Sequence, residues 1–112
     1  MSEAIVVLTT TGSKDEGLTI GRALVERRLA ACVNVTGPIE SVYRWKEQVE
    51  QAQEWLLIVK TTPEMFSAVR DAIRELHSYE LPECIQLDVR QGSAQYLAWI
   101  GESVVPTLGR QR

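Results

Sequence analysis

The chain has 112 residues, of which 45% are hydrophobic and 24% charged, and its formal net charge at pH 7 is −3. Such a composition is typical of one globular domain, long enough to bury a core without metal or disulfide cross-links. The acidic balance argues against a broad basic surface for nucleic acid, and no apolar run reaches the roughly 18 residues of a membrane span. We therefore expect a single domain over residues 1–112, with 106–112 as a flexible tail.

The cellular compartment is suggested by the N-terminus and the cysteines. The first residues, MSEAIVVLTT, lack the basic region and the separate cleavage site of a signal peptide. Cys32 and Cys84 lie far apart in apolar settings, which is typical of reduced thiols rather than of a disulfide framework. These features predict a cytoplasmic protein.

The first third of the chain predicts a strand, a helix and a second strand. Residues 4–10 are apolar and β-branched, as in a central strand. Ser13-Lys14-Asp15-Glu16 has the form of a capping box, in which each end residue can satisfy the backbone N–H of the other. The helix should run from there to about Arg28. Cys32 opens the next strand, which Gly37-Pro38 should kink or bulge. The expected buried face of the helix is formed by Ile20, Leu24 and Val25.

A long hairpin is predicted between Pro38 and Thr61, with a tight turn near Lys46–Gln48. Its first arm alternates with a period of two, and its second arm, Gln48–Thr61, begins polar and ends apolar on both faces. That arm would be about 45 Å long at roughly 3.3 Å per residue, whereas a compact chain of this size is only about 34 Å across. The hairpin should therefore meet another copy of the chain. Aromatic anchors favour interfaces, so the expected contact residues are Tyr43, Trp45 and Trp55.

The second half predicts two helices and a strand. Thr62-Pro63-Glu64 should begin a helix, with Thr62 as N-cap and Pro63 in the first helical position, that ends near His77. Residues 84–89 alternate as a strand, and Ser93 can cap a short last helix. The order β-α-β-β-α-β plus a C-terminal helix predicts an α+β ferredoxin-like sandwich, with helices on one face of an antiparallel sheet. Many unrelated activities share this fold, so the fold alone identifies no function.

The polar residues around the second helix end leave two interpretations open. His77, the only histidine, either interacts with the helix macrodipole or acts as a ligand. No Cys-x-x-Cys or His-x-x-x-His pair accompanies it, so one chain alone does not make a transition-metal site. The next residues, from Tyr79 to Glu83, form either a rigid turn or a pocket wall in which a carboxylate meets Lys60 or Arg27 across an interface.

Five segments in chain order resemble the CutA family, the divalent-cation tolerance proteins. They are Glu26–Asn34 (ERRLAACVN), Ser41–Trp45 (SVYRW), Lys60–Thr62 (KTT), His77–Glu83 (HSYELPE) and Tyr96–Trp99 (YLAW). Each segment is short, but five in register make the resemblance specific. It implies a ferredoxin-like subunit in a tight homotrimer similar to that of the PII signalling proteins, with long hairpins packed against neighbouring subunits. It also implies a link to copper and other divalent cations.

The chain departs from the family at some positions. Thr9 stands where some members carry a cysteine, and Leu76-His77 stands where they carry a histidine pair. Of the copper ligands proposed in such members, only His77 is present here. An imidazole with carboxylates still suits several divalent ions. The predicted ligands for copper or zinc are His77 and Glu83, with no cofactor required, and the predicted ligand cleft contains Arg27, Asn34, Lys60, Tyr79 and Glu80.

Together these inferences predict a non-enzymatic, cytoplasmic homotrimer linked to divalent-cation tolerance. It would bind a metal ion or a small anion in clefts between its subunits, and it would bind no nucleic acid. The alternative is a PII-like module that senses a small metabolite and has no physiological metal. An acylphosphatase-like hydrolase is a third reading, because Arg27 and Asn34 could hold a phosphate, but no loop of backbone donors lies between them.

Overall fold

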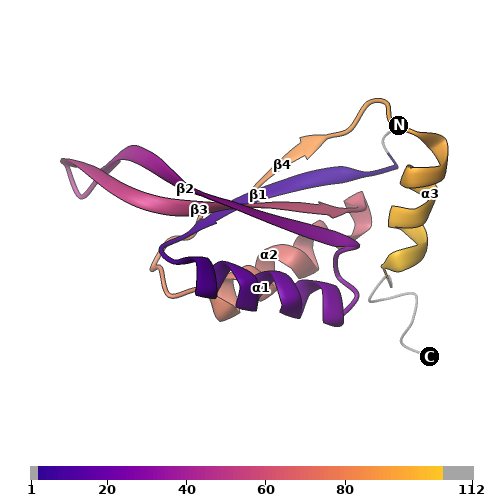
Figure 1. The fold of residues 1–112 in the computed structure, drawn as a ribbon, viewed down its shortest axis with the longest axis horizontal. Coiled ribbons are helices and arrows are strands. Elements are labelled where there is room, and N and C mark those ends of the chain that lie inside the picture. The colour runs from indigo at the N-terminus through magenta and orange to yellow at the C-terminus, as the bar shows by residue number, and fades with distance from the viewer. Residues whose placement is uncertain (1–2, 105–112) are drawn as a thin grey trace.

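The computed structural model describes residues 3–104, and its strands form one antiparallel sheet (Figure 1). The elements in chain order are β1 (Ile5–Thr11), α1 (Lys14–Glu26), β2 (Cys32–Trp45), β3 (Gln48–Thr61), the 3₁₀ turn η1 (Pro63–Met65), α2 (Phe66–Leu76), β4 (Ile85–Asp88) and α3 (Ala94–Ser103). The strand order in the sheet is β2-β3-β1-β4. Helices α1 and α2 cover one face, and α3 stands at the end of the sheet away from the hairpin tip. The predicted α+β class is confirmed, whereas the predicted tail lies outside the described residues.

The core lies between the sheet and the two helices. Val7 of β1 pairs with Val59 of β3, and both side chains are fully buried together with Ile20 and Ile73 of the helices. This follows from the period of two in each strand, which sends every second side chain to the same face. Val25 was expected in the buried face of α1, but that expectation is wrong, because its side chain is 40% exposed.

The opposite face of the sheet, which we call the open face, has no helix over its middle (Figure 1). Strand alternation sends the even-numbered residues of β1 and β3 to this face, and the register adds their partners in β2 and β4. Two apolar side chains of β4 remain half exposed here, Ile85 at 49% and Leu87 at 50%. The other apolar members are Val6, Leu8, Leu56 and Ile58. The open face is therefore largely apolar and only partly covered within one chain.

The long hairpin is confirmed. Strands β2 and β3 have 14 residues each, but β1 pairs with β3 only over Trp55–Thr61, so within the described sheet residues 39–54 pair with one another alone. The molecule consequently extends to 45 Å along its longest axis. The predicted bulge is also confirmed, because the register shifts between Thr36 and Ile39, around a cis Gly37–Pro38 peptide bond. The turn consists of Lys46 and Glu47, and both have positive φ, as in a type I′ turn.

The helix boundaries agree with the predicted signals in part. Ser13 and Ser93 cap α1 and α3 through their hydroxyl groups. Thr62 has the predicted N-cap position and Pro63 follows it, but the Thr62 side chain makes no capping hydrogen bond, and the helix begins with one 3₁₀ turn. Arg28 ends α1 with a positive φ of 61°, and its guanidinium donates to the carbonyls of Glu102 and Ser103 at the end of α3. Of the helices within residues 3–104, none has the length and apolarity to cross a bilayer.

Candidate functional site

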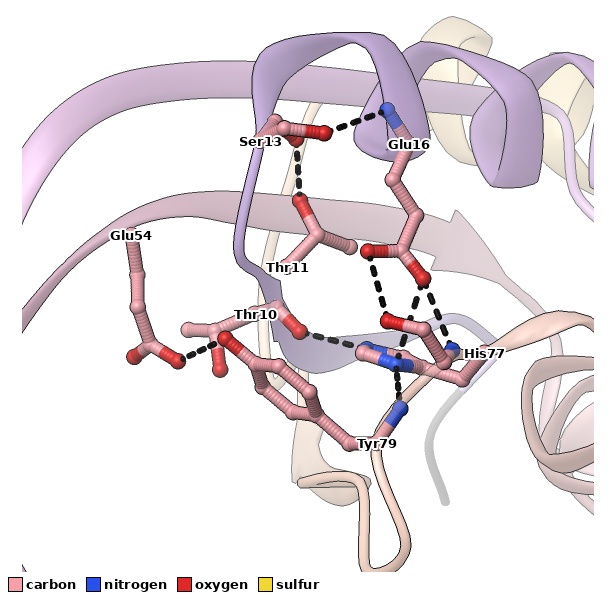
Figure 2. A network of polar contacts seen from close by, with 8 residues as sticks. Thr10, Thr11, Ser13, Glu16, Glu54, His77 and Tyr79 are labelled. Carbon is pink, nitrogen blue, oxygen red and sulfur yellow. Dashed lines mark hydrogen bonds and ion pairs between the residues drawn. The ribbon is translucent and has the colours of Figure 1, made fainter.

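His77 anchors the connector between α2 and β4 to the end of β1. Strand β4 pairs with β1 only from Ile5 to Leu8, so the connector runs beside the remaining part of β1. The Nε2 atom of His77 lies 2.6 Å from the carbonyl oxygen of Thr10, and the backbone N–H of Tyr79 donates to Nδ1 over 3.0 Å (Figure 2). Since a carbonyl only accepts, this geometry identifies a neutral imidazole with its proton on Nε2. The side chain is 0% exposed.

Glu16 of α1 holds the same connector from the other side. Its backbone N–H donates to the Ser13 hydroxyl over 3.1 Å, as a capping box requires. Its carboxylate, however, accepts hydrogen bonds from the Ser78 N–H at 2.8 Å and the Ser78 hydroxyl at 3.1 Å, and lies 3.5 Å from Nδ1 of His77. The capping box prediction is therefore only half right. The Glu16 side chain joins two elements that are 62 residues apart.

Tyr79 links the connector to the base of the hairpin. Its hydroxyl donates to the carboxylate of Glu54 over 2.7 Å, and its ring lies 4.6 Å from that of His77 (Figure 2). Burial and this hydrogen bond raise the pKa of Tyr79 far above its ordinary value, so the phenol stays a donor. Gly12 leaves the space for this contact, because a Cβ at Gly12 would lie 3.2 Å from the hydroxyl. Glu54 itself is only 7% exposed.

Glu83 completes an acidic cluster, which we define as Glu54, Tyr79 and Glu83. Partial desolvation and the charge of Glu54 raise the pKa of Glu83 above its ordinary value. Glu83 stands two residues before Ile85, which pairs with Leu8, so it lies beside the end of β1. Glu80 is directed elsewhere, and its carboxylate lies 4.0 Å from the ammonium of Lys46 at the hairpin tip. The cluster thus concentrates negative charge at the base of the hairpin.

The basic and amide residues predicted for the same cleft lie apart from the acidic cluster in this chain. Arg27, at the end of α1, pairs with Glu75 of α2 over 3.4 Å. Lys60 is six residues beyond Glu54 on the same face of β3, a separation of about 20 Å along a strand. Asn34 lies on neighbouring β2 at the Lys60 side, opposite Ile58. One chain therefore does not bring the predicted cleft residues together, because Arg27 lies in the helical layer and Lys60 and Asn34 lie away from Tyr79.

The predicted metal ligands, His77 and Glu83, can bind a metal only if their donor atoms are available. Both ring nitrogens of His77 are engaged, one as donor and one as acceptor, so the imidazole offers no free lone pair in this conformation. Residues 3–104 contain no group of three His, Cys, Asp or Glu side chains that could hold a metal ion. In this conformation His77 does not fit as a metal ligand, whereas the carboxylates of the acidic cluster are suitable oxygen donors. Whether the chain binds metal through His77 and Glu83 stays a prediction.

The aromatic residues expected at an interface occupy different settings. Tyr43 is 42% exposed on the hairpin, and Trp45 is half-buried with the Lys46 ammonium 5.6 Å from its ring centre. Trp55 packs within its own chain against Gly37, where a Cβ would come within 2.7 Å of the indole. Their role in a trimer stays a prediction.

Two residues of the site were not predicted from the sequence. Glu16 was interpreted only as part of a helix cap, and the one sign of Glu54 was a carboxylate directly before an apolar run.

Comparisons with known proteins agree with this structure. The family model for the CutA1 divalent ion tolerance protein matches residues 5–103. The chain is 44% identical over 98 residues to the Divalent-cation tolerance protein CutA of Thermus thermophilus, covering 88% of this chain and 95% of that protein. It is 37% identical over 100 residues to rice "Protein CutA 1, chloroplastic", covering 89% of this chain but only 56% of that protein.

Solved structures of CutA proteins also resemble the structure of this chain. The Thermus thermophilus Cut A1 structure aligns with a TM-score of 0.89 at 42% identity, covering 91% of this chain and 99% of that one. The CutA structure from Xylella fastidiosa gives a TM-score of 0.90 at 35% identity, covering 93% and 100% of the two chains. The structures and the family model over residues 5–103 confirm the resemblance seen in the five sequence segments. The chain belongs to the CutA1 divalent ion tolerance protein family.

Proposed function

We propose that this chain acts as a homotrimer that contributes to divalent-cation tolerance by binding a cation or a small ligand in clefts between its subunits. The subunits would be ferredoxin-like, would be arranged as in PII proteins, and would carry no enzymatic activity. The observation that carries this proposal is the acidic cluster at the edge of an apolar sheet face that one chain leaves uncovered. The name of the Thermus relative, a divalent-cation tolerance protein, supports the link to metals.

Assembly is supported by apolar side chains exposed on the open face and on the hairpin. Ile85 and Leu87 are half exposed on the open face, and Val42 and Val49 of the hairpin are exposed at 68% and 67%. Exposed apolar patches often mark interaction sites in soluble proteins, and here two separate pairs of apolar side chains are exposed. The projecting hairpin, with Tyr43 near its end, would lie against a neighbouring subunit and bury its apolar side chains there.

Cation binding is supported by the chemistry of the cluster. Two carboxylates beside a phenol that stays protonated offer oxygen ligands, which suit hard divalent ions and, with lower selectivity, zinc. His77 would position Tyr79 through the N–H···Nδ1 bond rather than ligate the metal. A direct ligand role for His77, with copper as the cation, would first require its bonds to Tyr79 and Thr10 to break.

Two measurements test this proposal, namely the mass of the oligomer and a titration with metal ions. Native mass spectrometry of the wild type should give a trimer, and a monomer would contradict the proposal. Calorimetric titration with Cu²⁺, Zn²⁺ and Ni²⁺ should then compare the wild type with Glu83→Gln and His77→Ala. We expect Glu83→Gln to weaken binding about tenfold, which corresponds to about 1.4 kcal/mol. Loss of binding in His77→Ala, with full binding in Glu83→Gln and in Tyr79→Phe, would instead identify the imidazole as a ligand, because Tyr79→Phe tests the positioning role.

A second candidate function is a PII-like sensor of a small metabolite that uses no metal. It is favoured by Lys60 and Asn34, which could bind an anionic group once a neighbouring subunit covers the open face. A thermal-shift assay with small anions and with divalent cations tests this function, because a ligand that binds the folded state raises the unfolding temperature. Stabilisation by an anion and by no cation would favour the sensor. A cytoplasmic location is consistent with Cys32 and Cys84, which are both free thiols.

A further inference from the structure

A groove lies between α1 and β2 on the helix side of the sheet, and we call it the α1–β2 groove. Strand β2 is outermost in the described sheet and pairs there only with β3, so the groove is open along the sheet edge. Gly21 lets α1 approach β2 closely, because a Cβ at Gly21 would lie 3.1 Å from the Val33 side chain. The groove has a volume of about 270 Å³, and its apolar lining residues are Leu18, Val25, Val33 and Val35.

The helical wall of the α1–β2 groove is only partly covered. Leu18 and Val25 are 45% and 40% exposed. They are seven residues apart on α1, which places them on the same side of the helix and about 10.5 Å apart along its axis. Arg22 and Glu26 are exposed at the rim, and within residues 3–104 neither has an ion-pair partner within 4.0 Å. The groove therefore offers two apolar contact points beside unpaired charges.

The described part of the chain ends next to this groove. Val104 packs in the same buried cluster as Leu29, which follows α1. The guanidinium of Arg28 donates to the carbonyls of the last two residues of α3 over 3.4 and 3.3 Å. The chain therefore leaves α3 beside the C-terminal end of α1, where the groove begins at Val25.

Residues 105–112 (VPTLGRQR) have a sequence that matches the groove. They contain two apolar residues three positions apart, Val105 and Leu108, followed by Arg110 and Arg112. Pro106 restricts its own φ angle and favours an extended conformation for the residue before it. In a polyproline II conformation, which has three residues per turn and a rise of about 3.1 Å, Val105 and Leu108 share one face and lie about 9 Å apart.

We propose that segment 105–112 binds in the α1–β2 groove of its own chain, with Val105 against Val25 and Leu108 against Leu18. The spacing of about 9 Å between the two apolar residues of the segment agrees with the spacing of about 10.5 Å between their partners on α1. Binding would remove the exposed apolar surface of the helical wall from water, which is the favourable contribution.

The charges favour the same direction of binding. A second hollow continues along α1 from Leu18 to Asp15, an exposed carboxylate without an ion-pair partner among residues 3–104. From Val104 to Arg110 the segment spans about 19 Å at 3.1 Å per residue. The axis of α1 from Glu26 back to Asp15 measures about 16 Å, so Arg110 reaches the acidic first turn of the helix. The inference goes beyond the proposed function, because the groove faces away from the open face and requires neither a trimer nor a metal ion.

Methyl NMR of the full chain tests the contact. Nuclear Overhauser contacts are expected between the methyl groups of Leu108 and Leu18, and between those of Val105 and Val25. Leu108→Asp should abolish the contact between Val105 and Val25. Thr107→Asp is the matched control and should retain both contacts, because position 107 lies off the apolar face of the segment.

Thermal unfolding measures the coupling between the two sides. Leu108→Asp should lower the unfolding temperature of the full chain by about 3 °C. In a Leu18→Asp background the same substitution should lower it by less than about 1 °C, because its partner is already lost. Leu18 is 45% exposed, so its replacement leaves the core intact, and circular dichroism of each variant checks this.

Three outcomes would overturn the proposal. The first is the absence of both contacts in the full chain, which would leave the groove to a segment of another protein. The second is an equal fall in unfolding temperature for Leu108→Asp with and without Leu18→Asp. The third is contacts that appear only between labelled and unlabelled chains refolded together, which would assign the groove to the segment of a neighbouring copy. A monomeric wild type would overturn the proposed homotrimer and leave this inference standing.

Discussion

The hydroxyl of Tyr79 donates a 2.7 Å hydrogen bond to the buried carboxylate of Glu54, and this single contact joins the connector after α2 to the base of the hairpin. The ring of Tyr79 also lies against His77, whose Nε2 atom holds the end of β1. A chain of polar contacts therefore runs from β1 through the connector to β3. These contacts tie the connector to both β1 and the base of the hairpin.

Tyr79→Phe should destabilise the subunit by about 1.5–3 kcal/mol. The change removes the donor and leaves a buried carboxylate without a hydrogen bond, which is more costly than losing a neutral pair. Urea unfolding of the two proteins measures the difference. Tyr43→Phe is the matched control, because Tyr43 is 42% exposed and a phenylalanine there should change stability by less than about 0.5 kcal/mol. Equal effects of the two substitutions would show that the Glu54 contact contributes nothing.

Much of the fold could be predicted from local patterns. The β-branched run before Thr11, the period of two in the first hairpin arm, the Ser13 cap and the proline at position 63 are properties of short segments, and each appears at the expected place. The length of the hairpin also predicted correctly that residues 39–54 extend past the sheet. Such signals depend on neighbours in sequence, and tertiary contacts seldom reverse them.

The errors arose where distant residues decide the outcome. Glu16 fits a capping box, yet its carboxylate finds a better pair of donors in Ser78, 62 positions away. Val25 fits a helical stripe, but α1 turns only part of that stripe toward the sheet. Lys60 and Tyr79 were predicted for one cleft between subunits. Within one chain Tyr79 contacts Glu54, about 20 Å from Lys60 along β3, so their shared cleft stays a prediction. None of these long-range relationships produces a periodic pattern in the sequence.

Thr9→Val should stabilise the subunit by about 1 kcal/mol. The Thr9 side chain is fully buried, and its hydroxyl is the one buried side-chain polar atom within residues 3–104 that lacks a hydrogen-bond partner. Valine has nearly the same shape and removes the unsatisfied group. Thr61→Val is the contrasting substitution, because the hydroxyl of Thr61 donates to the carbonyl of Leu29 over 2.7 Å, and its loss should destabilise. Thermal unfolding of both variants should give shifts of opposite sign.

The raised pKa of Glu83 predicts a pH dependence of stability. In the folded chain this carboxyl keeps its proton to a higher pH than its ordinary value of 4.5, because of partial desolvation and the charge of Glu54. The folded state therefore binds more protons than the unfolded state just above that pH, and stability falls as pH rises through this window. Glu83→Gln cannot titrate, so its urea midpoint should decline less than that of the wild type between pH 4 and pH 7. Parallel curves for the two proteins would contradict the prediction.

Glu47→Gly should stabilise the hairpin by about 1 kcal/mol. Lys46 and Glu47 have φ values of 51° and 69°, and for a residue with a Cβ this left-handed conformation is unfavourable, whereas glycine adopts it freely. Type I′ turns favour glycine at the second central position for this reason. The control is Glu50→Gly in the regular part of β3, where the same substitution adds backbone freedom without relieving strain and should destabilise by about 0.5–1 kcal/mol. Slower amide exchange in residues 39–54 of Glu47→Gly, with unchanged exchange in β1, would place the gain in the hairpin, and an unchanged or faster rate there would refute the prediction.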